Sequence, residues 1–288
     1  AVRGATKFMK TNNNDAESTG AETLKSFDSD GFTVGTDADM NTSGEAVVAW
    51  CWKGGGSASS NSVGDITTSL SASSASGFSV VSYTGTGSEQ TIGTGLSSPV
   101  KMIIIKRRTG TYDWATWNIG LTNRYSIMLN ETDAQTDDGA GWFPAAGVTT
   151  TSTTFLLGNS SRTNGSSVAY IAHCFAAIQG FSKFGAYEGN GNADGAFVYT
   201  GFRPAFVMTK SIDSTSSWHM FDAKREGYNV DNDALAAEVT DAEATADQID
   251  LLSNGFKCRI ATDPNVAETY IYMAFAEAPF VNSNGVPC

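Results

Sequence analysis

The sequence predicts an all-β protein in which packed sheets recur along the chain. Short runs rich in Val, Ile, Tyr and Phe alternate with clusters of Gly, Ser, Thr, Asn and Asp at roughly 8 to 12 residue intervals, as the strands of a sandwich require. Helical periodicity is almost absent. Runs such as 102–105 are apolar at successive positions, so both faces of the strand must be covered. This pattern favours two packed sheets over one exposed sheet.

The same series of residues and short motifs occurs twice in the same order, about 103 residues apart. The first copy opens with Gly77-Phe78-Ser79 and the second with Gly180-Phe181-Ser182. Each continues through a tyrosine, paired glycines, an apolar run, a lysine and a tryptophan. We interpret this order as a tandem duplication and expect complete units at residues 77–180 and 181–288. The recurring lysine and tryptophan are Lys106 and Trp114 in one copy, Lys210 and Trp218 in the other.

Residues 1–53 match only the back half of such a unit. Ser29-Asp30-Gly31-Phe32 and the apolar run 46–52 parallel Ser253-Asn254-Gly255-Phe256 and the run 270–275. The chain therefore opens within a unit, and we predict a strand over residues 46–52. Because a half sandwich exposes strand edges, we expect another segment or a neighbouring subunit to complete it.

The remaining segments are predicted to be irregular. Residues 54–76 are rich in Gly and Ser and should form a flexible linker, because they bury too little apolar surface to offset the entropy of ordering them. No comparable tract separates the two complete units, which should abut closely. Residues 234–249 mix apolar and acidic residues without clear periodicity, so we expect a loop with at most one helical turn.

Charge limits the possible partners. The chain has 18 Lys and Arg against 30 Asp and Glu, a formal net charge of −12, and its longest basic run is Lys106-Arg107-Arg108. This balance argues against nucleic acid or an anionic membrane as a partner. No stretch reaches the roughly 18 apolar residues of a transmembrane helix, so membrane insertion is not expected.

The four cysteines are predicted to be free thiols. Cys51 and Cys174 occupy equivalent positions, where the third copy has Ala274, as expected for small core residues and not for a disulfide. Cys258 and Cys288 are interpreted in the same way, although the sequence leaves a disulfide between them open.

The sequence carries no recognisable catalytic motif. His173 and His219 lie within or beside predicted strands and away from any nucleophile elbow, so we interpret them as structural. Zinc spacings, a P-loop and a dinucleotide fingerprint are absent from the sequence. Acidic residues do not recur between the copies as a pair of the kind that glycoside hydrolysis needs. We predict that the chain is not an enzyme.

One acidic loop is a candidate metal site. Asp37, Asp39 and Asn41 place oxygen ligands at alternate positions, and Ca²⁺ prefers such ligands. The run lacks the sixth-position glycine and the acidic twelfth residue of an EF-hand. A solvated acidic loop is the competing interpretation, and no other cofactor is expected.

Four aromatic residues without a clear counterpart in the other copy are candidates for binding a glycan or a partner: Tyr112, Tyr125, Trp142 and Phe143. Trp142 and Phe143 lie in a polar, glycine-rich loop, where they could form a sugar-stacking or protein-contacting surface. The alternative is a loop plug packed on its own domain. Trp114 and Trp218 recur and are expected to anchor the core of each unit.

Several segments resemble a repeat domain of tailed bacteriophages. The resemblance is carried by Gly77-Phe78-Ser79-Val80-Val81-Ser82-Tyr83-Thr84-Gly85-Thr86-Gly87, Gly180-Phe181-Ser182-Lys183-Phe184-Gly185, Tyr199-Thr200-Gly201-Phe202-Arg203-Pro204-Ala205-Phe206 and Phe275-Ala276-Glu277-Ala278-Pro279-Phe280. It covers nearly the whole chain and is similar to repeats of tail-fibre and other virion structural proteins, often found beside LamG-like (concanavalin-type) modules. The resemblance implies tandem jelly-roll-like antiparallel β-sandwiches on the exterior of a virion, and it supplies no catalytic motif.

These observations lead to a functional hypothesis. We expect a non-enzymatic, extracellular virion protein of a tail fibre or appendage that adheres to a host-surface glycan or receptor. Expected partners are other virion proteins and copies of the same chain, with a trimer as one arrangement. A purely architectural subunit, such as a head decoration or filament protein, is the alternative. A polysaccharide depolymerase is more remote and would need two carboxylates about 5 to 10 Å apart.

Overall fold

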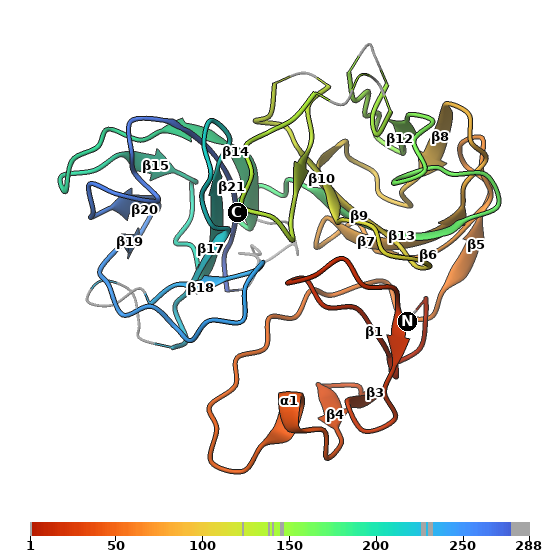
Figure 1. Ribbon diagram of the computed structural model, residues 1–288, viewed down its shortest axis with the longest axis horizontal. Coiled ribbons are helices and arrows are strands. Elements are labelled where there is room, and N and C mark those ends of the chain that lie inside the picture. Colours follow the sequence, from red (N-terminus) through yellow and green to blue (C-terminus); the bar gives the residue numbers. More distant parts are fainter. Residues whose placement is uncertain are drawn as a thin grey trace, which may run out of the picture.

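The computed structural model describes residues 2–122, 124–137, 139, 141–144, 147–225, 229 and 233–277. The described chain is all-β, as predicted, and contains one short helix, α1 (Ala38–Asn41). Figure 1 shows two β bodies side by side, with the N-terminal segment below both. We call them the first sandwich, which ends with β13 (Ala169–Ala176), and the second sandwich, which begins with β14 (Ser182–Glu188).

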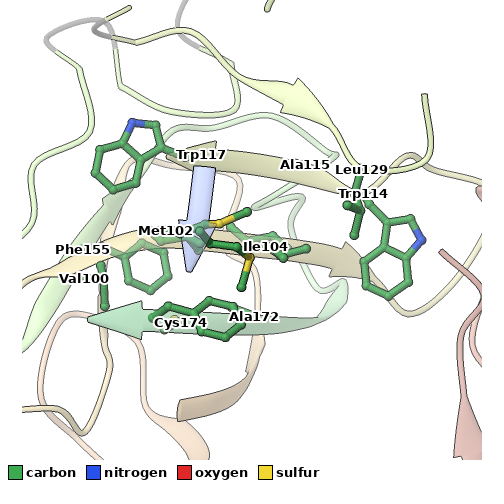
Figure 2. Close-up of a cluster of buried hydrophobic side chains, with 14 of the residues drawn as sticks. Val100, Met102, Ile104, Trp114, Ala115, Trp117, Leu129, Phe155, Ala172 and Cys174 are labelled. Carbon is green, nitrogen blue, oxygen red and sulfur yellow. The ribbon is translucent and has the colours of Figure 1, made fainter. Parts of the chain in front are cut away.

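The first sandwich packs a large antiparallel sheet against a small one. The large sheet has the order β11-β10-β9-β13-β7-β6-β5, and the small sheet pairs β12 with β8. Both faces of the central strands are buried, since residues 102–105 of β9 all belong to the core, as predicted. Figure 2 shows part of this core, with Phe155, Val100 and Cys174 labelled. The remaining strands are β5 (Ser59–Asn61), β6 (Thr68–Ser73), β7 (Phe78–Thr84), β8 (Gln90–Gly93), β9 (Val100–Arg107), β10 (Ala115–Asn118), β11 (Ile127–Met128) and β12 (Thr154–Leu157).

The second sandwich has the same plan. Its large sheet has the order β14-β21-β16-β17-β18 and its small sheet the order β15-β20-β19. Val207, Phe221 and Phe256 are fully buried between them. The further strands are β15 (Phe197–Tyr199), β16 (Phe206–Ser211), β17 (His219–Asp222), β18 (Leu235–Ala236), β19 (Ile249–Leu252), β20 (Gly255–Cys258) and β21 (Thr269–Phe275).

The two large sheets correspond strand for strand. Reading β11-β10-β9-β13-β7 against β18-β17-β16-β21-β14 gives the same order and the same antiparallel pairing. A tyrosine pair stacks at 5.2 Å between ring centroids in each sandwich, Tyr83 on Tyr170 and Tyr187 on Tyr270. The two sandwiches therefore share one topology. Their origin by duplication stays a prediction.

The expected flexible linker at residues 54–76 contains two strands instead. β6 pairs with β7 from Ser69 to Ser73, and β5 pairs with β6. Ser71 accepts a hydrogen bond from Gly55 N at 3.0 Å and donates one to Gly56 O at 2.8 Å. This polar segment is ordered because the free edge of β7 offers its backbone groups hydrogen-bonding partners, which burial of apolar surface alone would not provide.

The N-terminal segment forms two small hairpins and α1. β1 (Lys7–Phe8) pairs with β2 (Ser18–Thr19), and β3 (Leu24–Phe27) pairs with β4 (Phe32–Val34). The strand predicted over 46–52 does not form, and Cys51 is exposed, contrary to the prediction of a buried thiol. In each sandwich the equivalent strand, β13 or β21, is hydrogen-bonded on both sides to strands of the front half. Among the described residues, no strand is paired with residues 46–52. Cys174 and Cys258 are buried free thiols, as predicted, and Cys288 lies outside the described residues.

The three parts of the chain meet at one aromatic cluster. Trp52 lies 6.0 Å from Phe175 and 5.7 Å from Phe275, and these two phenylalanines lie 6.1 Å apart, measured between ring centroids. The three residues stand at equivalent positions of the N-terminal segment and the two sandwiches, one residue after Cys51, Cys174 and Ala274. Mutual contact of three equivalent residues indicates a three-membered arrangement around a common centre. The expected close abutment of the complete units is seen in their shared core.

The contact between neighbouring parts repeats. Trp218 Nε1 donates to Met128 O at 2.9 Å, and Trp114 Nε1 donates to Lys10 O at 3.1 Å. Two further backbone bonds accompany each indole bond: Ser216 N to Thr132 O and Gln135 N to Ile212 O in one contact, Tyr112 N to Asn14 O and Glu17 N to Arg108 O in the other. The three bonds of one contact correspond one to one to the three bonds of the other, and on each side of the contact the bonded residues follow one another at the same spacing along the chain. The second sandwich thus sits on the first as the first sits on the N-terminal segment.

Candidate binding surface

Trp142 and Phe143 do not form an exposed binding surface. Trp142 is 5% exposed and Phe143 is fully buried, both within the core of the first sandwich. Trp142 O accepts hydrogen bonds from Thr163 Oγ1 and Gly158 N, and the Arg162 guanidinium lies 4.7 Å from the Trp142 ring. Because each ring hides 150–250 Å² of surface when buried, packing inward is strongly favoured. The loop-plug alternative is therefore correct, and stacking of a sugar on these rings is excluded.

Tyr112 and Tyr125 are each half-buried. The Tyr112 ring lies under Arg107, with 4.1 Å from the guanidinium carbon to the ring centroid, and the Tyr112 backbone bonds to Asn14 of the N-terminal segment. Tyr112 is thus part of an internal contact. Tyr125 N closes a turn by donating to Thr122 O at 2.7 Å. The Tyr112 ring is therefore covered on one face by Arg107, and Tyr125 stays a candidate that the structure shows only as half-buried.

The three predicted metal ligands have separate partners. Asp37 caps α1 by accepting a hydrogen bond from Asp39 N at 3.0 Å, and Asp39 forms an ion pair with Lys10 at 3.2 Å. Asn41 Nδ2 donates to Gly35 O at 2.8 Å. The described residues contain no group of three or more His, Cys, Asp or Glu side chains arranged to hold a metal ion. Ca²⁺ binding at this loop stays a prediction.

An aromatic pair that the sequence reasoning overlooked is exposed on β15. Phe197 and Tyr199 are 48% and 58% exposed, whereas Val198 between them is 6% exposed. Successive side chains of a strand point to opposite faces, so the two rings share the outer face of the small sheet and Val198 enters the core. β15 is the edge strand of this sheet. Two large aromatic rings therefore lie together on one accessible edge.

The first sandwich has no such surface at the equivalent position. Ile92 of β8 corresponds to Val198, because Ile92 pairs with Phe155 as Val198 pairs with Phe256. Thr91 and Gly93 then take the places of the two rings. Residues 61–66 cover this edge: Gly64 and Ile66 bridge to Ile92, and Asp65 bonds to Thr91. The mismatch of Phe-Val-Tyr with Thr-Ile-Gly is the signal in the sequence that could have identified the pair.

Charged and polar groups surround the aromatic pair. Lys183 Nζ donates to Tyr199 O at 2.6 Å and lies 5.1 Å from the centroid of its ring. Lys257, which pairs with Phe197 across the sheet, forms an ion pair with the exposed Asp194. The hydrogen bond from Lys257 lowers the pKa of the Asp194 carboxyl, which is therefore ionised at neutral pH. The edge combines flat apolar faces with fixed donors and acceptors.

A second feature is an apolar pocket of about 490 Å³ where the three parts meet. Trp50 and Trp52 of the N-terminal segment, Phe78 and His173 of the first sandwich, and Met208 and Met273 of the second line it. Burial lowers the pKa of His173 to about 4, so the imidazole is neutral at physiological pH. The described lining residues include no carboxylate. The pocket offers apolar contact, without the carboxylate pair of a glycosidase site.

The comparisons with known proteins identify a family by its sequence. The sequence profile of a family described as a domain of unknown function, DUF7483, matches residues 1–279. The chain belongs to the DUF7483 family. One DUF7483 profile thus spans the N-terminal segment and both sandwiches. The searches of curated proteins and of solved structures give no match. In the described part of this DUF7483 chain, no helix is long and apolar enough to cross a membrane.

Proposed function

We propose that this chain is a non-enzymatic structural protein of a tailed-phage virion, in a tail fibre or another external appendage, that adheres to a host-surface glycan through β15. The resemblance of its repeats to those of virion proteins supports the location. The exposed pair Phe197 and Tyr199 carries the adhesive part of the proposal. Apolar patches that stay exposed on a folded protein mark interaction sites.

The chemistry of the edge favours a sugar. A flat aromatic face packs against the apolar face of a pyranose ring, and side chains on two successive outward positions of a strand lie about 7 Å apart. Lys183 lies beside the Tyr199 ring, and Lys257, the cross-strand neighbour of Phe197, holds Asp194; these charged groups can hydrogen-bond to hydroxyl groups. A protein surface would also contact these rings, and the binding experiment separates the two.

The test measures binding of the full chain to a glycan array and to host cells. Phe197→Thr, which introduces the residue of the first sandwich, and Tyr199→Ala should each reduce binding at least tenfold, since each removes a stacking face. Both should leave the melting temperature nearly unchanged, because the rings are half-exposed. Ile119→Ala, at another exposed apolar residue, is the matched control and should bind normally. Unchanged binding by both β15 variants would rule out this surface.

An architectural subunit is the second candidate. It is favoured by the core that the two sandwiches share and by the position of the Trp52 ring, 6.0 Å from Phe175 and 5.7 Å from Phe275 between ring centroids. In that case the chain would bind no glycan. The β15 variants would instead impair assembly with other virion proteins or with copies of this chain, measurable by light scattering.

A further inference from the structure

The β3–β4 hairpin resembles β19–β20 but lacks its cover. Phe27 pairs with Phe32 across the first hairpin as Leu251 pairs with Phe256 across the second. Leu251 and Phe256 are fully buried against the large sheet, and β20 is also hydrogen-bonded to β15. By contrast, Phe27 is 61% and Phe32 is 40% exposed, and among the described strands β4 pairs only with β3. The hairpin is missing a facing sheet and an edge partner.

A set of asparagines identifies what is missing. Asn164 and Asn265 are fully buried, and each fastens the back half of its sandwich to a front-half loop: Asn164 Oδ1 accepts from Thr86 N at 2.9 Å, and Asn265 Oδ1 accepts from Asn190 N at 3.2 Å. Each also donates to a carbonyl of its own back half, Gly158 O or Ile260 O. Asn41 is the equivalent residue, and its side chain makes only this last kind of bond to described residues, to Gly35 O.

Residues 46–52 give the same indication. The equivalent strands β13 and β21 lie between two front-half strands, β7 and β9 or β14 and β16. A segment with the apolar sequence of a central strand is therefore present without either neighbour. Each lost contact in the N-terminal segment is one that a front half provides in the sandwiches.

The second sandwich has a surface that corresponds to the one by which the first sandwich contacts the second, but this surface has no described partner of that kind. The bridge between Ser126 and Thr136 in the first sandwich corresponds to the bridge between Ala234 and Ala244 in the second. The same offset identifies the second-sandwich residues that correspond to Met128, Thr132 and Gln135; they are Ala236, Thr240 and Glu243. No described residue bonds to them as the first-sandwich residues are bonded by Trp218, Ser216 and Ile212. Residues 239–247 are all exposed, including the apolar Val239.

We propose that these two surfaces together bind one further front half of the repeat, a separate four-stranded polypeptide segment built like residues 180–223. Its equivalents of β14 and β16 flank residues 46–52, its equivalent of β15 pairs with β4, and its tryptophan bonds to Ala236 O. The segment covers Phe27 and Phe32 and supplies the loop that Asn41 lacks. Binding completes a third sandwich and closes the three-membered arrangement around Trp52, Phe175 and Phe275. This inference does not depend on glycan adhesion.

The test supplies a front half of the repeat to the full chain by fusion. A duplicate of residues 180–223 is joined to Val2, because Val2-Arg3 corresponds to Lys224-Arg225 in the repeat. We expect amide hydrogen exchange to slow at least tenfold in residues 24–34, 46–52 and 239–247, compared with a chain carrying a Gly-Ser extension of equal length. Trp218→Ala within the duplicate should remove the protection of 239–247 and retain that of 24–34.

Two further measurements keep the proposal falsifiable. An extension by residues 77–119 of the first sandwich supplies a second donor, in case the first one misfolds. Exchange at the Gly-Ser control rate with both donors would overturn the proposal. Light scattering and hydrogen exchange of the unextended chain test whether a second copy covers the hairpin instead. An oligomer in which residues 24–34 are already protected would equally overturn the proposal.

Discussion

Replacing Asn265 with Ala should destabilise the chain by about 3 to 5 kcal/mol. The Asn265 side chain is fully buried and makes five polar contacts within the second sandwich, in which the two hydrogens of Nδ2 are shared among three acceptors. Its Oδ1 accepts from the backbone nitrogens of Asn190 and Ala196, and its Nδ2 donates to Asn190 Oδ1, Asn192 O and Ile260 O. At about 1 kcal/mol net for each bond, with water replacing some of them after truncation, the loss lies in this range.

The same substitution at the two equivalent asparagines provides internal controls. Asn164 is also fully buried but makes three side-chain bonds, so Asn164→Ala should cost about 2 to 4 kcal/mol. Asn41 is exposed and makes a single side-chain bond to described residues, so Asn41→Ala should cost less than about 1 kcal/mol. In the chain extended by residues 180–223, however, Asn41→Ala should become as costly as Asn164→Ala.

Equilibrium unfolding in urea, followed by tryptophan fluorescence, measures these differences. Because the two sandwiches share one core, we expect a single transition from which the free energy of unfolding is extrapolated. If Asn41→Ala in the unextended chain costs as much as Asn265→Ala, the view that Asn41 lacks its front-half partners is refuted. A cost below 1 kcal/mol at Asn265 would refute the hydrogen-bond reasoning itself.

The remaining predictions concern a histidine and the cysteines. The pKa of His173 is lowered from 6.5 to about 4, mainly by burial and secondarily by Arg3, so the unfolded chain binds more protons in this interval and stability should fall as pH drops from 6.5 to 4. The loss is at most about 3 kcal/mol, and His173→Met, the residue found at the equivalent position 273, should remove it; an unchanged pH profile in urea unfolding would contradict this. A thiol reagent should modify Cys51 in the native protein and spare Cys174 and Cys258, whose pKa values burial raises to about 12. Peptide mass spectrometry measures this, and equal labelling of Cys174 would contradict the structure.

The sequence predicted well those features that depend on local pattern. The all-β class followed from short β-branched and aromatic runs. Comparison of the copies also matched the segments that form β13 and β21, and these two strands occupy the same position in their respective sheets. Predictions failed where the partner of a segment decided its structure. Residues 68–73 are polar but join the free edge of β7, whereas residues 46–52 are apolar but pair with no strand in the described part of the chain.

The candidate binding residues show the same division. Trp142 was chosen because it lacks a counterpart in a polar loop, yet loop composition does not reveal whether a ring turns inward. Phe197 and Tyr199 also lack aromatic counterparts, but they lie within a strand, where aromatic residues are usual and attract no attention. Their exposure depends on whether another segment covers the edge, as residues 61–66 cover β8, and that is a property of the whole fold.

The position of β13 and β21 has a consequence for folding during synthesis. Each is the last strand of its sandwich to leave the ribosome, yet it hydrogen-bonds to strands made long before it. Strands β7 and β9 therefore wait without their central neighbour while about 60 further residues are added, and such non-local pairing is slow. The two edges that flank the central strand therefore stay open until the last strand of the sandwich has been made.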